Sequence, residues 1–234
     1  MERNPLRWPL TCLGGILVIL FYCLFTFTAW LLYPAPYGPL THYLSRLGDW
    51  ARSPIGALFY NAGCVLTGAA LIPFFLGLRD WYDEKRWRLV LVVGGQGLGV
   101  ASAVALMMIG VFSEDFGQPH RLASSAFFVL LFFVLIVVSS GLLIHPGFVK
   151  GIAVYGFAID AMTLGLELTI SGPLTEWFTV FAALSYVGLL VINTFRLAAY
   201  RTAATKKTGL VVAAAAVPLC APFTKVDVAV PTQA

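Results

Sequence analysis

One histidine and two carboxylates stand close together in residues 113–120. Glu114 and Asp115 precede His120 in a short polar segment between two apolar runs. A carboxylate that is hydrogen-bonded to a histidine fixes the tautomer of the ring, which general acid–base catalysis requires. The same three side chains are a minimal set of ligands for a divalent metal ion. The segment predicts acid–base chemistry or metal binding, and the alternative is that its charges only help to cap the next helix.

A second polar set lies upstream, in residues 34–55, which predict a short amphipathic helix. Ser45 and Asp49 stand four positions apart and share one face of such a helix. The helix would lie on the membrane surface with its apolar face in lipid or in the mouth of the bundle, and would present Ser45 and Asp49 to a site there. The alternative is a solvated interfacial helix without a function. The apolar positions of this pattern are Leu40, Tyr43, Leu44 and Leu47.

A third set lies inside an apolar run. Asp160, Thr163 and Glu167 are spaced i, i+3 and i+7, which places them on one stripe of a helix. An ionised aspartate at the centre of a bilayer costs about 2.5–3.5 kcal/mol, so we expect Asp160 to face the protein interior. Carboxylates inside a membrane are by default functional, and a hydrogen-bonded structural aspartate is the alternative.

Six apolar runs must position these residues. A bilayer core needs about 20 apolar residues in helical form, because every backbone amide must be bonded within its own segment. The chain of 234 residues is 59% hydrophobic and only 11% charged, which suits this environment. We predict an all-α, polytopic six-helix transmembrane bundle in residues 1–200, followed by a cytoplasmic or interfacial tail, residues 201–234. The predicted spans are about 10–33, 56–78, 89–112, 122–144, 151–171 and 177–199.

The basic residues predict how the bundle is oriented. With the N-terminus in the cytoplasm, Arg46, Arg52 and Arg121 are the only ones of the 15 Lys and Arg residues that fall outside. Cytoplasmic loops carry an excess of Lys and Arg, so this asymmetry predicts that both termini are cytoplasmic. The polar segments 34–55 and 113–120 then face out of the cell, and the plasma membrane is the expected location.

Several short segments at this outer face resemble a known family. The segments are Leu44-Ser45-Arg46-Leu47-Gly48, Asn61-Ala62-Gly63, Gly110-Val111-Phe112-Ser113-Glu114, His120 with Ser124, and Gly165-Leu166-Glu167. In this order they resemble the prokaryotic membrane family called domain of unknown function 998, over about residues 10–199. Two positions depart from the family pattern, since Ser113 stands where the family usually has proline and Leu168 where an arginine often follows the glutamate. The family has no established activity, so the resemblance implies only the architecture and the location of a site.

The residues of these motifs fall at one depth, near the outer interface, and predict a common pocket. They are Ser45, Asn61, Glu114, His120 and Glu167. The function that we place first is an accessory or structural subunit of a membrane assembly, in which this polar network holds the bundle together. Membrane lipids are the expected partners, and other membrane proteins or a second copy of the chain are open. No motif indicates a cofactor, and the basic residues between apolar runs do not indicate nucleic-acid binding.

Two further functions stay open. An enzyme acting on a lipid or lipid-linked substrate would use His120 as the general base, oriented by Glu114 or Asp115. Its nucleophile would be Ser45 or a water molecule, and Asn61 would stabilise the oxyanion. A small carrier or lipid-binding protein would instead use Asp160 and Glu167 to bind protons or a cation.

Overall fold

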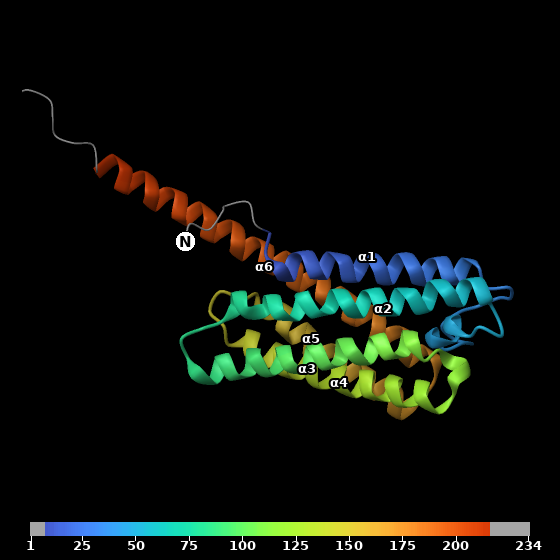
Figure 1. Cartoon of the computed structure of the whole chain (residues 1–234). Coiled ribbons are helices and arrows are strands. Elements are labelled where there is room, and N and C mark those ends of the chain that lie inside the picture. The colour runs from blue at the N-terminus through green and yellow to red at the C-terminus, as the bar shows by residue number, and fades with distance from the viewer. Residues whose placement is uncertain (1–7, 216–234) are drawn as a thin grey trace, which may run out of the picture. The chain divides into compact units, whose positions relative to one another are not determined.

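The structure is a computed structural model that describes residues 8–215, with side chains as far as residue 203. Within this part of the chain every regular element is a helix (Figure 1). The long helices are α1 (Leu10–Leu31), α2 (Pro54–Gly77), α3 (Arg86–Val111), α4 (Gln118–Leu143), α5 (Lys150–Thr169) and α6 (Pro173–Ala215). Three short 3-10 helices are η1 (Leu44–Gly48), η2 (Leu78–Trp81) and η3 (Glu114–Phe116). Six helices are long and apolar enough to cross a membrane, which confirms the predicted class.

The chain divides into two compact units, residues 1–198 and 199–234. The first unit contains the bundle, with α6 as far as residue 198. The second unit continues as helix to Ala215, beyond the predicted end of the last span at about 199. The apolar part of the predicted tail after residue 215 lies outside the described residues.

Proline residues help to set where the helices begin. Pro54 and Pro173 are the first residues of α2 and α6, and Pro119 lies in the first turn of α4. Proline has no backbone N–H to donate, which costs nothing in the first turn because those N–H groups have no partner within the helix. The prolines therefore fix three of the six starts without weakening the helices.

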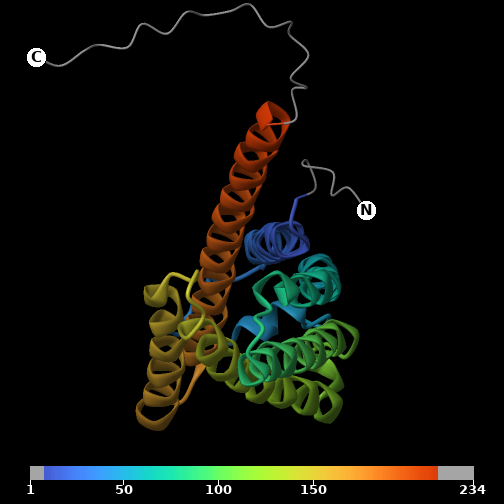
Figure 2. The same ribbon diagram turned by 90° about the vertical axis from the view of Figure 1, so that its left-hand side faces the viewer.

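Successive helices of the first unit are neighbours, from α1 to α5. The first part of α6 lies between α1 and α5 (Figure 2). On one side the rings of Tyr22 and Phe181 meet with their centroids 6.2 Å apart, and on the other Thr163 and Thr179 share a hydrogen bond of 3.0 Å. The end of the bundle that carries η1, η3 and the turn from α5 to α6 is called the η1 end below. That this end faces outward stays a prediction from the charge distribution.

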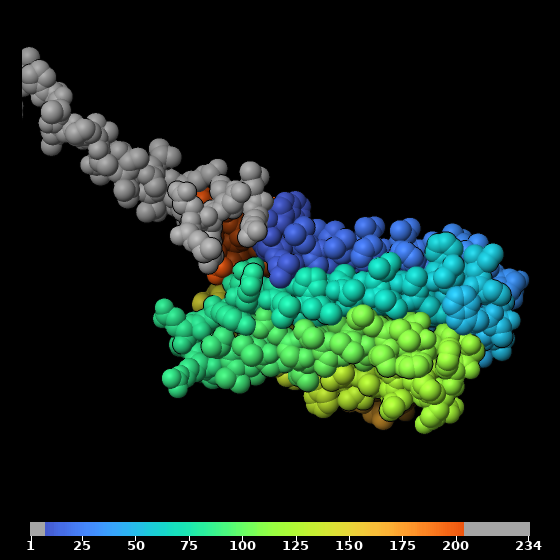
Figure 3. Space-filling model, viewed as in Figure 1, coloured from blue at the N-terminus to red at the C-terminus, as the bar shows by residue number. Residues whose placement is uncertain are grey.

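The first connection, residues 32–53, contains the short helix η1, which covers only the second half of the predicted amphipathic pattern. Leu44 and Leu47 are fully buried in η1, whereas Leu40 and Tyr43 lie outside it with exposed fractions of 78% and 48%. The physical reason is that distant groups take up the backbone N–H groups at the start of η1, as described below. In the space-filling view the connection lies against the ends of α1 and α2 (Figure 3).

Candidate functional site

A small cavity lies beneath η1 and has both polar and apolar side chains in its wall. It is called the polar cavity below because its polar groups distinguish it from the deeper cavity of the bundle. The volume of the polar cavity is about 20 Å³, which is room for about one water molecule. The polar side chains around it come from five different elements of the bundle. They are Tyr22 of α1, Ser45 of η1, Tyr60 of α2, Ser124 of α4 and Glu176 of α6. Because so many elements meet here, the cavity is a property of the assembled bundle and not of any one segment.

Glu176, in the first turn of α6, holds η1 over this cavity. Its carboxylate accepts the backbone N–H of Leu44 at 2.9 Å and that of Ser45 at 3.2 Å. Two consecutive backbone N–H groups of η1 thus share one carboxyl group of α6, which links the two elements. The neighbouring Trp177 adds a third link, because its indole Nε1 donates to the carbonyl oxygen of His42 at 3.0 Å.

Aromatic side chains pin the same connection to α1. The indole of Trp30 donates to the carbonyl oxygen of Tyr37 at 3.1 Å, and the Tyr37 hydroxyl in turn donates to the carbonyl oxygen of Tyr43. Burial, with the nearby carboxylate of Glu176 as a second cause, raises the pKa of Tyr37 above its ordinary value. The phenol therefore keeps the proton with which it holds the connection.

His120 and Ser124 form a hydrogen-bonded pair at the edge of the cavity. His120 is buried, with Nδ1 2.8 Å from the carbonyl oxygen of Phe112 and Nε2 3.2 Å from Oγ of Ser124. A carbonyl oxygen can only accept, so the proton of the neutral ring is on Nδ1. Nε2 is then the acceptor, and the Ser124 hydroxyl donates to it. This is the order of nucleophile, base and orienting group found in acyl-transfer sites, with a backbone carbonyl as the orienting group.

The carboxylates that were predicted to orient His120 have other partners. Glu114 faces Arg46, with Oε1 3.5 Å from Nε, and Asp115 accepts a hydrogen bond of 2.6 Å from the hydroxyl of Ser113. Across the described residues, no three His, Cys, Asp or Glu side chains come together in a way that could hold a metal ion. The predicted ligand set of His120, Glu114 and Asp115 is therefore not assembled.

Asn61 and Asp49 stabilise the end of η1 and the residues that follow it. Nδ2 of Asn61 donates to the carbonyl oxygen of Gly48 at 3.1 Å, which ties α2 to the end of η1. A Cβ atom at Gly48 would lie 2.4 Å from Oδ1 of Asn61, so this contact requires glycine. Asp49 accepts the N–H of Ala51 and pairs with Arg52 at 3.0 Å. Neither Asn61 nor Asp49 lines the cavity, and both shape the connection above it.

The three residues of the predicted stripe on α5 lie in three different environments. Asp160 is buried, and its Oδ2 has no hydrogen-bond partner. Thr163 bonds to Thr179 of α6, whereas Glu167 is exposed and accepts a hydrogen bond of 3.3 Å from Ser171. None of the three residues of the stripe lines the polar cavity, so the structure does not bring them together with Ser45 and His120.

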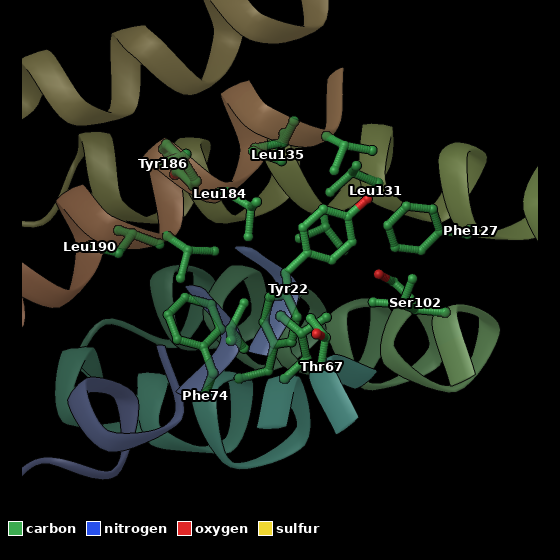
Figure 4. A pocket seen from close by; sticks show the side chains of 18 of the residues that line it. Tyr22, Thr67, Phe74, Ser102, Phe127, Leu131, Leu135, Leu184, Tyr186 and Leu190 are labelled. Atoms are coloured by element: carbon green, nitrogen blue, oxygen red, sulfur yellow. The ribbon is translucent and has the colours of Figure 1, made fainter. Parts of the chain in front are cut away.

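A larger, apolar cavity adjoins the polar one and lies deeper in the bundle (Figure 4). Its volume is about 60 Å³. The two cavities share four lining residues, which are Tyr22, Leu106, Phe127 and Val180. Figure 4 shows the ring of Tyr22 pointing toward Leu131 and Phe127. Together the cavities carry polar groups beneath η1 and are almost wholly apolar toward the middle of the bundle.

The sequence matches the family described as "Protein of unknown function (DUF998)" over residues 16–159. This match covers more than half of the chain and agrees with the resemblance of its motifs. The chain belongs to this family. No curated protein and no solved structure matches it. The DUF998 region includes η1, His120 and Ser124, and it ends before Glu176.

Four of the five polar residues around the cavity in this DUF998 protein were not predicted as site residues, namely Tyr22, Tyr60, Ser124 and Glu176. Ser124 appears in the motif that begins at His120, and its i+4 spacing places both side chains on one face of a helix. Glu176 is the one carboxylate between the last turn and the middle of the last apolar run, three residues after Pro173. An acidic residue at that position could have indicated a buried contact, but the sequence does not indicate that η1 is its partner.

Proposed function

We propose that this protein binds a single-chain amphiphile inside the membrane, with the polar head beneath η1 and the chain in the bundle core. The observation that carries the proposal is that the polar and apolar cavities adjoin and share four lining residues. An amphiphile is the ligand class whose two parts match these two environments.

The polar cavity favours a small head without negative charge. Its volume of about 20 Å³ suits a small head such as a hydroxyl, an ester carbonyl or a primary amine. No Lys or Arg side chain lines it, so a charged phosphate would be buried there without a positive partner. A hydroxyl or amine could instead donate to the Glu176 carboxylate or to Oγ of Ser124.

The apolar cavity sets the direction of the chain. Along α4, the lining runs from Ser124 through Phe127, Leu131 and Leu135 to Val138. At 1.5 Å per residue this path is about 21 Å long, more than half of the roughly 30 Å hydrocarbon core. A chain with its head at Ser124 would lie along the bundle. Because the two cavities measure only about 60 Å³ and 20 Å³, the surrounding side chains must move apart to admit a chain of this length.

This function is close to one of the sequence-based alternatives, a lipid-binding protein, but it uses different residues. The earlier alternative relied on Asp160 and Glu167, which do not line either cavity. The role as an accessory subunit stays a prediction, as does the plasma-membrane location with the η1 end outward.

Native mass spectrometry of the full chain, released from detergent micelles after incubation with a long-chain alcohol, tests the proposal. We expect a one-to-one adduct with the alcohol and much less with the alkyl phosphate of equal length. Val134→Phe should abolish the adduct, because Val134 lines the apolar cavity and is buried. Val129→Phe is the matched control, because Val129 on the same helix is 56% exposed. Equal binding by both variants would refute the proposal.

A further inference from the structure

We infer that Ser124 is a nucleophile for acyl transfer, with His120 as its general base, and that its substrate is a neutral ester of a single acyl chain. The inference rests on the proposed function, which brings the chain of the ester into the apolar cavity. It adds a reaction at the point where the two cavities meet.

The hydroxyl of Ser124 has a base as its hydrogen-bond partner. Hydroxyls within a helix commonly donate to the backbone carbonyl four residues earlier. Thr28, Thr169 and Thr179 do so here, at 2.7–2.8 Å. Ser124 has the same choice, and it donates instead to the imidazole of His120. Its proton is thus held by a base and not by the backbone.

The hydrogen bonds of the imidazole select the tautomer that a base needs. The Phe112 carbonyl holds the proton on Nδ1 and leaves the lone pair of Nε2 toward Ser124. His120 is buried behind Ser124, and only Ser124 of the two lines the polar cavity. A ligand in the cavity therefore meets the hydroxyl first, with the base on its far side.

The reaction balances without a metal, a redox partner or any co-reactant except water. Oγ of Ser124 bonds to the ester carbonyl carbon while its proton moves to Nε2 of His120. The bond from the carbonyl carbon to the alcohol oxygen breaks, and His120 gives its proton to that oxygen. Water then attacks the acyl-serine, His120 takes the water proton, and the proton returns to Oγ as the acid leaves.

Other groups in the cavity wall suit this series of reaction steps. The hydroxyls of Tyr22, Ser45 and Tyr60 line the same cavity and are the candidate donors to a developing oxyanion.

An alkyl fluorophosphonate with a long chain tests the nucleophile in the purified full chain. The probe forms an Oγ–P bond with an activated serine and loses fluoride, and peptide mass spectrometry locates the adduct. We expect an adduct on Ser124 in the wild type and none in Ser124→Ala. Ser125→Ala is the matched control, because the neighbouring Ser125 is exposed, and it should be labelled at the wild-type rate.

A histidine variant tests the base. The amide of His120→Asn can still donate to the Phe112 carbonyl, so the fold should survive, which size-exclusion chromatography checks. The labelling rate should fall about 100-fold, as expected for the loss of a general base. An unlabelled wild-type Ser124, or an unchanged rate in the folded His120→Asn protein, would overturn the inference.

The same proteins separate this inference from the proposed function. If Ser124→Ala still binds the long-chain alcohol while the wild type forms no adduct on Ser124, the protein is a binding protein and the nucleophile is refuted. If the wild type binds no alcohol at all, the proposed function itself is refuted.

Discussion

The carboxylate of Glu176 accepts a hydrogen bond of 2.9 Å from the backbone N–H of Leu44, which lies 132 positions earlier in the chain. This contact joins the start of the last helix to the first connection. It closes the η1 end of the bundle above the polar cavity. The fold therefore brings segments that are far apart in the sequence together at the candidate site.

Removal of this carboxylate should loosen η1. In Glu176→Ala the N–H groups of Leu44 and Ser45 lose their acceptor, and we expect the protein to be destabilised by about 1–3 kcal/mol. Hydrogen–deuterium exchange at these two amides should become faster. Glu167→Ala is the control, since Glu167 is exposed and accepts a hydrogen bond from the nearby Ser171. Equal exchange in the two variants would show that Glu176 does not hold η1.

The contact between η1 and α2 should tolerate no side chain at Gly48. A Cβ atom there would lie 2.4 Å from Oδ1 of Asn61, so Gly48→Ala must push the two elements apart. We expect a loss of stability of about 1–3 kcal/mol, seen as a lower midpoint of thermal unfolding in detergent. Gly38→Ala, in the same connection, should have little effect because no atom lies within 4 Å of its Cβ position. A midpoint for Gly48→Ala that matches Gly38→Ala would contradict the close packing.

At the opposite end of the bundle, an ion pair predicts a pH dependence. The hydrogen bond from Arg88 lowers the pKa of Asp83 below its ordinary value of 3.8. Because the folded pKa lies below the unfolded one, the stabilisation is present above about pH 4 and is lost as the pH falls through the folded pKa. Asp83→Asn should thus unfold at a lower temperature than the wild type at pH 6, and the difference should shrink at pH 3. A difference that does not change with pH would rule out this ion pair as its source.

The orientation of the bundle can be tested with single cysteines. Leu40 is 78% exposed in the first connection, and Glu84 is exposed at the opposite end. If both termini are cytoplasmic, a membrane-impermeant maleimide should label Leu40→Cys in intact cells and Glu84→Cys only after permeabilisation. The chain without an added cysteine gives the background. The reverse pattern would invert the predicted topology.

The sequence predicts the six helices well because each depends on a local property, a run of apolar residues long enough to cross a bilayer. It also identifies His120 and Ser45, since polar residues between such runs are few. Their partners could not be predicted, because they depend on how helices pack. His120 bonds to the Phe112 carbonyl oxygen where a carboxylate was expected. The helix η1 begins only at Leu44, where the Glu176 carboxyl group accepts its first backbone N–H.

The stripe on α5 illustrates the same limit. Helical periodicity correctly places Asp160 and Glu167 on related faces, but it does not indicate which other helix each of them meets. The packing of α5 leaves Glu167 exposed and Asp160 buried. Asp160 and Glu167 therefore share a helix face but do not belong to one site.

The central claim is that the chain of an amphiphile lies inside the bundle, and the most direct test is where such a chain can be cross-linked. A long-chain alcohol with a diazirine at its far end is irradiated with the full chain, and the modified residues are mapped by peptide mass spectrometry. We predict cross-links at buried residues of the apolar cavity, such as Leu135, Val138 and Leu190, that disappear in Val134→Phe. Cross-links confined to lipid-facing residues such as Val129 and Phe133, or unchanged in Val134→Phe, would contradict the account.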